Sequence, residues 1–363
     1  MMARLASARQ QAVATLPAGR AWGRPRSVLL GLLVLLVVAL VLNLGYGAVT
    51  ISPVQIIAIL AERIGWDLGI TYTEQQVAVI WAIRLPRVLL GVLVGAALAV
   101  AGAILQGIFR NPLAEPGLIG VSSGAALAAV ATIVLDLVLI GPATLPLAAF
   151  LGGLVTTFVV YSLARHHGRT EVVTLVLTGI AVNALAGALT GFLVFFASDQ
   201  QLRAIVFWSL GSLGGATWPA VWASAPFVVV PVLLAPRFGL ALNLLALGER
   251  EAFHLGLDTE RLRLILIPLA ALMTGAAVAV AGTVGFVGLV APHLLRLIGG
   301  PDHRYVLPAS ALGGASLVLL ADLTARTVVA PAELPLGVVM AMLGGPFFLW
   351  LIQRTRREQG GWG

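Results

Sequence analysis

Arginine carries most of the polar chemistry open to this chain, because lysine and cysteine are both absent from its 363 residues. Without cysteine there can be no disulfide, thiolate metal site or thiol nucleophile. Without lysine there can be no complete phosphate-binding loop, since the lysine of that loop reaches the phosphates. The chain therefore cannot itself be an ATPase of the Walker type.

The other ionisable side chains are not placed to form a relay across a membrane. The apolar stretches 88–109, 172–197 and 264–287 contain no ionisable residue, whereas ion-coupled transporters place such residues at mid-membrane. No carboxylate pair, metal cluster or Ser/His/Asp set converges in the sequence. We therefore expect no catalytic residues and no metal site, and we expect any driving energy to come from another subunit.

The composition indicates which elements must hold these residues. Hydrophobic residues make up 60% of the chain and charged residues 10%, against about 25% charged residues in soluble domains. Backbone in lipid must satisfy its own hydrogen bonds, so we predict an all-α polytopic membrane protein of about ten transmembrane helices. The predicted apolar segments are 28–49, 88–109, 117–135, 145–164, 172–197, 218–235, 264–287, 307–321 and 335–352, with a short broken segment at 288–299.

The positions of the arginines predict which side each loop faces. Of the 22 basic residues, five are assigned to the outer side and the other 17 to the cytoplasmic side, following the positive-inside rule. Both termini are then cytoplasmic, with a tail at 1–27, a transmembrane domain at 28–353 and a tail at 354–363. No basic face is available for a nucleic acid. The five outer arginines are Arg63, Arg84, Arg87, Arg203 and Arg326.

An internal repeat is visible in the stretch 84–124 and in a later segment. The octad GAALAVAG at 95–102 returns as GAAVAVAG at 275–282, with Pro112 and Pro292 at the same offset behind the two copies. The two copies lie five spans apart, an odd step, so they should cross the membrane in opposite directions, as in the inverted repeats of transporters. The alternative is that such octads recur by chance in so apolar a chain.

A charged segment at 242–263, LNLLALGEREAFHLGLDTERLR, separates two predicted spans on the cytoplasmic side. Its apolar residues have helical spacing, Gly248 and Gly256 divide it into two short helices, and Asp258 is a suitable N-cap for the second. Such helices can lie on the lipid surface or in the groove of a partner protein. The acidic residues of the segment favour a protein partner, because the cytoplasmic leaflet is itself negative.

Taken together, several motifs resemble the permease subunits of bacterial ATP-driven importers for iron chelates, haem and vitamin B12, the FecCD-type family. The resemblance covers nearly the whole chain from about Val28. It implies the type II ABC importer permease fold, a homodimer, two ATPase subunits and a periplasmic substrate-binding protein. The motifs are RLPR at 84–87, RNPLAEPGLIGVSSGA at 110–125, ALGEREAFHLGL at 246–257, GFVGLVAPHLLR at 285–296 and AELPLGVVMAMLGGPFFLWL at 332–351.

The resemblance also implies that Arg84, Arg87 and Arg326 pair with acidic residues on the two lobes of the binding protein. The alternative is that they are headgroup anchors, whose stems lie in the membrane while their charge reaches the interface. Arginine on the outer side runs against the positive-inside trend, and this favours the docking role.

Two cytoplasmic features follow from the same resemblance. Asn111 and Leu113 would line an inner gate, with a second gate element near 169–172. The loop at 246–257 matches the coupling helices that sit in a groove of the ATPase. The residues assigned to this contact are Gly248, Glu249, Ala252, Leu255 and Gly256.

The segment 197–213, ASDQQLRAIVFWSLGSL, is most similar to haem-importing members. It implies haem as the cargo, no permanently bound cofactor, and ATP bound by the partner subunit. Arg203 could contact a carboxylate of the entering ligand, or could instead pair with Asp199 at i−4. Vitamin B12 or a ferric siderophore is the alternative cargo. An ion-coupled secondary transporter is the alternative from another class.

Overall fold

The computed structural model describes residues 24–166 and 169–358, which are mostly helical, with loops between the helices and one short hairpin. The elements of the first half are α2 (Arg24–Gly45), α3 (Pro53–Glu62), α4 (Glu74–Ala78), the π-helical turn η1 (Val79–Arg84), α5 (Leu85–Phe109), η2 (Pro116–Ile119), α6 (Val121–Val134), η3 (Gly141–Ala143), α7 (Thr144–Ala164), and the strands β1 (Arg165–His166) and β2 (Arg169–Thr170). Those of the second half are α8 (Val172–Phe195), α9 (Asp199–Leu210), α10 (Trp218–Leu234), η4 (Ala235–Phe238), α11 (Gly239–Ala246), α12 (Glu249–His254), α13 (Thr259–Ala281), α14 (Val287–Gly299), α15 (His303–Thr327) and α16 (Leu336–Glu358). Most of the predicted tail 1–27 and the end of the tail 354–363 lie outside the described residues.

Seven helical stretches of the described chain are long and apolar enough to cross a membrane. They are Pro25–Gly45, Glu74–Phe109, Gly141–Ala164, Val172–Phe195, Trp218–Ala246, Thr259–Ala281 and His303–Thr327. The shorter apolar helices α6, α14 and α16 correspond to the remaining predicted segments. The predicted all-α polytopic architecture of about ten membrane segments is confirmed.

Polar caps extend the helices beyond the apolar runs. The second span was expected to begin at residue 88, but its helix runs from Glu74 to Phe109 without interruption. Thr73 starts it with a capping box, in which its side chain accepts from the Gln76 amide at 3.2 Å and the Gln76 side chain accepts from the Thr73 amide at 3.0 Å. The box satisfies amides that have no partner within the first turn.

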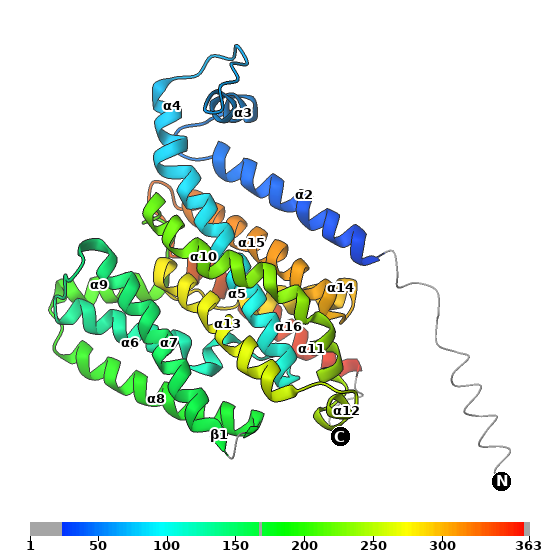
Figure 1. Ribbon diagram of the computed structural model, residues 1–363. Coiled ribbons are helices and arrows are strands. Elements are labelled where there is room, and N and C mark those ends of the chain that lie inside the picture. Colours follow the sequence, from blue (N-terminus) through cyan, green and yellow to red (C-terminus); the bar gives the residue numbers. More distant parts are fainter. Residues whose placement is uncertain (1–23, 167–168, 359–363) are drawn as a thin grey trace, which may run out of the picture.

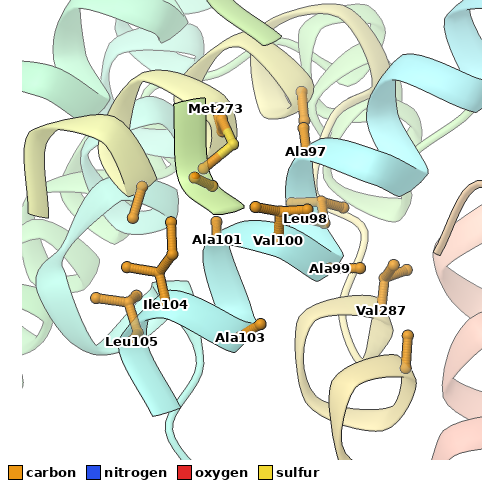
Figure 2. Close-up of a cluster of buried hydrophobic side chains, with 14 of the residues drawn as sticks. Ala97, Leu98, Ala99, Val100, Ala101, Ala103, Ile104, Leu105, Met273 and Val287 are labelled. Atoms are coloured by element: carbon orange, nitrogen blue, oxygen red, sulfur yellow. The ribbon is translucent and has the colours of Figure 1, made fainter. Parts of the chain in front are cut away.

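Helix α5 lies at the centre of the bundle and packs against α10, α13, α14 and α15 (Figure 1). Every residue of α5 from Val94 to Phe109 is buried, as expected for a helix that is apolar all round. Figure 2 shows its small and branched side chains beside Met273 of α13 and Val287 of α14. Figure 1 also shows α3 and α12 at opposite ends of the bundle, which are called here the α3 end and the α12 end.

The backbone of α5 touches its neighbours at two glycine positions. A Cβ placed on Gly95 would lie 2.7 Å from the Cα of Ala315 in α15. A Cβ placed on Gly102 would lie 2.6 Å from the Cα of Gly288 in α14. Any larger side chain would force the helices apart, and it is such small residues that let membrane helices pack backbone to backbone.

The two octads of the predicted repeat lie on α5 and α13, which run antiparallel. Leu213 packs on the first half of α5, while the preceding amide donates to the carbonyl of Ala281, at the end of α13, at 2.8 Å. The matched prolines are not equivalent, however. Pro112 lies in a turn after α5, whereas Pro292 lies inside α14. The inverted relation therefore holds for the helices and not for the prolines behind them.

Gly102→Ala is expected to destabilise the protein, because the added methyl group must push α5 away from α14. Overpacking of this kind typically costs about 1–3 kcal/mol. Thermal unfolding of the detergent-purified protein measures the effect. Gly31→Ala in α2 is the matched control, since no atom lies within 4 Å of a Cβ at that position. Equal melting temperatures for the two variants would contradict the packing constraint.

Candidate functional site

Three of the arginines predicted to face outward converge on the ends of α2 and α15 near the start of α5. Arg84 donates to the carbonyls of Leu44 and Gly45, the latter at 3.0 Å. Arg326 donates to the carbonyl of Tyr46 at 2.8 Å. The last carbonyls of a helix have no partner within it, and cations near them are favoured by the helix dipole. Arg84 and Arg326 together therefore close the C-terminal end of α2.

The third arginine, Arg87, binds two carboxylates from other parts of the chain. Its Nη2 lies 2.9 Å from Asp322 and 2.8 Å from Glu333, and its Nε and Nη1 add further bonds to Asp322 and Glu333 respectively. The Asp322 side chain is 2% exposed and that of Glu333 is 43% exposed. Bidentate pairs of this kind are the strongest protein hydrogen bonds. The bonds from Arg87 hold the pKa of Glu333 below its ordinary value.

The structure thus brings Arg84, Arg87 and Arg326 together, as their common side predicted, but adds carboxylate partners that the sequence did not reveal. Asp322 precedes Arg326 by four residues on one face of α15, and this spacing was the available signal. No comparable signal points to Glu333. All three side chains are directed largely into the protein, at 5% exposure for Arg84 and at 11% and 10% for the side chains of Arg87 and Arg326.

The residues assigned to the inner gate follow directly after α5. Arg110 ends the helix in a left-handed conformation with φ 49°, and the side chain of Asn111 then accepts from the Leu113 amide at 2.9 Å. Leu113 is 46% exposed. A cavity of about 220 Å³ opens beside this turn, between the ends of α5, α11 and α14. In its wall, Arg296 of α14 donates to the side chain of Gln106 in α5.

The segment 242–263 folds differently from the prediction in one respect. Its two short helices are the end of α11 and the separate helix α12. Asp258 does not cap either of them. Its side chain accepts from the Arg261 amide at 2.9 Å and so caps the long helix α13. An N-cap signal shows that a helix begins, and here that helix is the next membrane span.

The residues assigned to ATPase contact are arranged around α12. Gly248 and Gly256 flank the helix with φ 130° and 86°, conformations that favour glycine. Ala252 is fully buried, whereas Leu255 is 60% exposed. Glu249 faces α13 and forms an ion pair there. Leu255 is therefore part of the surface of this region, whereas the buried Ala252 holds α12 in place beneath that surface.

Arg203 lies on α9 and is exposed. Within the described part of the chain no carboxylate lies within 4.0 Å of it, so the alternative pairing with Asp199 is not formed. Gln201, in the same helix, donates to the carbonyl of Ile133 at 3.1 Å and holds α9 against the end of α6. Arg203 therefore keeps a free guanidinium on a fixed helix.

No group of three or more metal-ligating side chains converges in residues 24–166 and 169–358. His303 lies in the wall of the cavity beside the turn after α5. His303 Nδ1 lies 2.9 Å from the Asn243 side chain, and His293 sits on α14. The candidate sites are accordingly the arginine cluster, the α12 surface, the turn after α5, and Arg203.

Comparison with known proteins gives consistent matches along the chain. Residues 35–354 match the FecCD transport family. The chain is 45% identical over 348 residues to the hemin transport system permease protein HmuU of Yersinia pestis, covering 93% of this chain and 98% of that protein. It is 42% identical over 330 residues to the vitamin B12 import system permease protein BtuC of Escherichia coli, covering 91% and 95%.

A solved structure shares the architecture as well. An inward-facing conformation of a metal-chelate type ABC transporter superimposes with a TM-score of 0.80 at 32% sequence identity. The match covers 91% of this chain and 99% of that chain. The helix order described above is therefore that of an ABC transporter permease.

Arg87→Met is expected to destabilise the fold, because it leaves the carboxylate of Asp322 buried without its cation. Removing one partner of a buried pair costs about 3–5 kcal/mol. Thermal unfolding in detergent measures the loss, and adding Asp322→Asn to the variant should recover part of it. Arg203→Met, at an exposed arginine without an ion pair, is the control and should leave the melting temperature unchanged. An unaltered melting temperature for Arg87→Met would refute the structural role of the pair.

Proposed function

The chain belongs to the FecCD transport family and is the permease subunit of an ABC importer, and we propose that it carries haem, or a related iron chelate, from the periplasm to the cytoplasm. The ATP that drives transport would be bound by a partner subunit, since the chain has no lysine for a phosphate-binding loop. Family membership favours this mode of driving over the ion-coupled alternative.

The likeness to the hemin permease carries the choice of cargo, because it reaches 45% identity across 93% of the chain. The cobalamin import system permease protein BtuC of Halobacterium salinarum has the same identity over 79% of the chain, so vitamin B12 is the second candidate. Haem has carboxylates, and the exposed Arg203, which has no ion pair among the described residues, offers a guanidinium that can bind one.

An ATPase partner is proposed to bind at α12. Large apolar side chains are exposed together at and beside this helix, namely Leu247, Phe253 and Leu255. Contiguous exposed apolar groups bordered by charge mark interaction sites, and the acidic residues nearby disfavour an anionic lipid surface. On this assignment the α12 end is cytoplasmic and both tails lie on that side.

The α3 end is then periplasmic, and the cluster of Arg84, Arg87 and Arg326 is proposed to receive a periplasmic substrate-binding protein. Arg87 is the member whose partner reaches the surface, through Glu333. At the other end, Asn111 and Leu113 are proposed to line the exit as an inner gate. Their turn borders a cavity that α11 also lines, so the exit lies close to the helices that would contact the ATPase.

A second copy of the chain is proposed to pack along α8. In the single chain, only Leu175, Gly179 and Ala186 of this 24-residue helix are buried. Gly187 and Gly191 lie four residues apart with open space around them, the spacing that lets membrane helices approach closely. A homodimer would cover this face and place the transport path between the copies.

The proposed cargo is tested by reconstituting the permease with its ATPase and binding protein in liposomes. We expect ATP-dependent accumulation of haem, and none with an ATPase inactivated in its phosphate-binding lysine. Parallel assays with cobalamin and with a ferric siderophore provide the comparison. Accumulation of cobalamin but not of haem would replace the first candidate cargo by the second. Uptake that proceeds without ATP and is abolished by an ionophore would contradict an ABC mechanism.

Leu255→Ser is expected to weaken binding of the ATPase subunit by about tenfold or more, as truncation of an interface anchor commonly does. The side chain is 60% exposed, so the permease itself should fold normally. Pull-down of the ATPase and uptake per ATP hydrolysed report the effect. Leu68→Ser, at a 47% exposed leucine in the α3-end loop, is the matched control. Wild-type binding by Leu255→Ser would place the ATPase elsewhere.

A further inference from the structure

We propose that Arg263 is the positioning residue that passes movement of α12 on to α8, an inference that rests on the proposed binding of an ATPase to α12. Arg263 lies near the start of α13 and is 2% exposed. Its guanidinium connects two elements that are far apart in the sequence, Glu249 of α12 and Thr170 of β2.

On the α12 side, Nη2 of Arg263 binds the carboxylate of Glu249. Glu249 is the first residue of α12, a helix of six residues that also carries the exposed Phe253. Leu255 follows directly after its end. The surface offered to the ATPase and the carboxylate that holds Arg263 therefore belong to one short element, and a shift of that element must act on Arg263.

On the α8 side, Nη1 of Arg263 donates to the Thr170 carbonyl at 2.8 Å and to Glu260 at 3.3 Å. Glu260 in turn accepts from the amide and the hydroxyl of Thr170 at 2.7 and 3.1 Å. Thr170 is buried, and α8 begins two residues later at Val172. Glu260 thus binds the donor groups of Thr170 and Arg263 binds its carbonyl, and together they fix the segment that leads into α8.

The space around these contacts leaves α12 room to move. A cavity of about 820 Å³ lies between α12, β2 and the start of α13, with Glu249, Phe253 and Thr170 in its wall. Charged contacts, rather than close-packed apolar side chains, cross this gap. A buried guanidinium that lost its carboxylates would be left unpaired away from water, so the pairs should persist while α12 shifts. Coupling through a contiguous polar network of this kind requires a demonstrated movement at both ends.

Two single-label reporters follow that movement, and the absence of cysteine from the chain means that no native residue has to be removed first. Arg250→Cys places a spin label on α12, and Glu171→Cys places one before α8; both positions are exposed. Each is introduced into the full permease dimer assembled with its ATPase. The distance between the two copies of the label is measured by pulsed EPR, without nucleotide and with ATP plus vanadate.

In the otherwise unsubstituted complex we expect ATP to shift both label distances. With Arg263→Met, the α12 label should still shift while the α8 label should not, and uptake per ATP hydrolysed should fall about tenfold, within the range usual for coupling between sites. Glu249→Gln should behave in the same way, and because its side chain is 42% exposed it decides the matter if Arg263→Met fails to assemble. Arg261→Met, exposed on the same turn, is the matched control.

A merely structural role would make Arg263 a brace for the first turn of α13 through Glu260. In that case the α8 label would shift normally in Arg263→Met and in Glu249→Gln, and this result would overturn the link while leaving the importer assignment intact. Absence of ATP-dependent uptake together with absence of both shifts in the unsubstituted complex would overturn the assignment itself, and the link with it.

Discussion

Backbone contact at the glycines of α5 determines where the neighbouring helices can lie. Gly102 meets α14 and Gly95 meets α15 with no room for a side chain. Lipid tails are as apolar as leucine, so helices in a membrane are held together by such close packing rather than by a hydrophobic gain. Dispersion contacts weaken steeply with distance, and a gap of about 0.5–1 Å already loses a quarter to a half of the attraction. Helices α5, α14 and α15 are therefore expected to move as one body.

Polar contacts reinforce that body at the two ends of α5. Arg87, near the start, is bound to Asp322 of α15, and Gln106, in the last turn, donates to the Gly288 carbonyl of α14 at 3.2 Å. The region around α12 is built differently, since ion pairs cross an open cavity there. Segments with few buried apolar contacts have low local stability. The fold thus joins a fixed core to an element at the α12 end that is held less tightly.

The length of the apolar runs and the low share of charged residues were sufficient to predict the membrane segments, because both are local properties of the chain. The partners of the charges were not predictable in this way. Arg87 and Glu333 are 246 positions apart, and Arg263 and Thr170 are 93 apart, so no spacing rule relates them. Asp258 showed that a helix begins but not which one, because a cap carries no information about helix length. Arg84, Arg87 and Arg326 lie together in the structure, while their side of the membrane and their roles toward other proteins stay predictions.

Of the two carboxylates that bind Arg87, Asp322 is buried and Glu333 is exposed, and this difference affects any protein that binds at that surface. The charge of Arg87 is already neutralised by these carboxylates. An acidic group from another protein that displaced Glu333 would therefore exchange one ion pair for another, and the number of ion pairs would not increase. Such an exchange contributes selectivity more than strength. Because Glu333 belongs to the same chain, it stays close to Arg87 and competes with the partner's acidic group for it. A contact built in this way is suited to short-lived binding, in which an acidic partner is selected by its charge and is displaced when Glu333 binds Arg87 again.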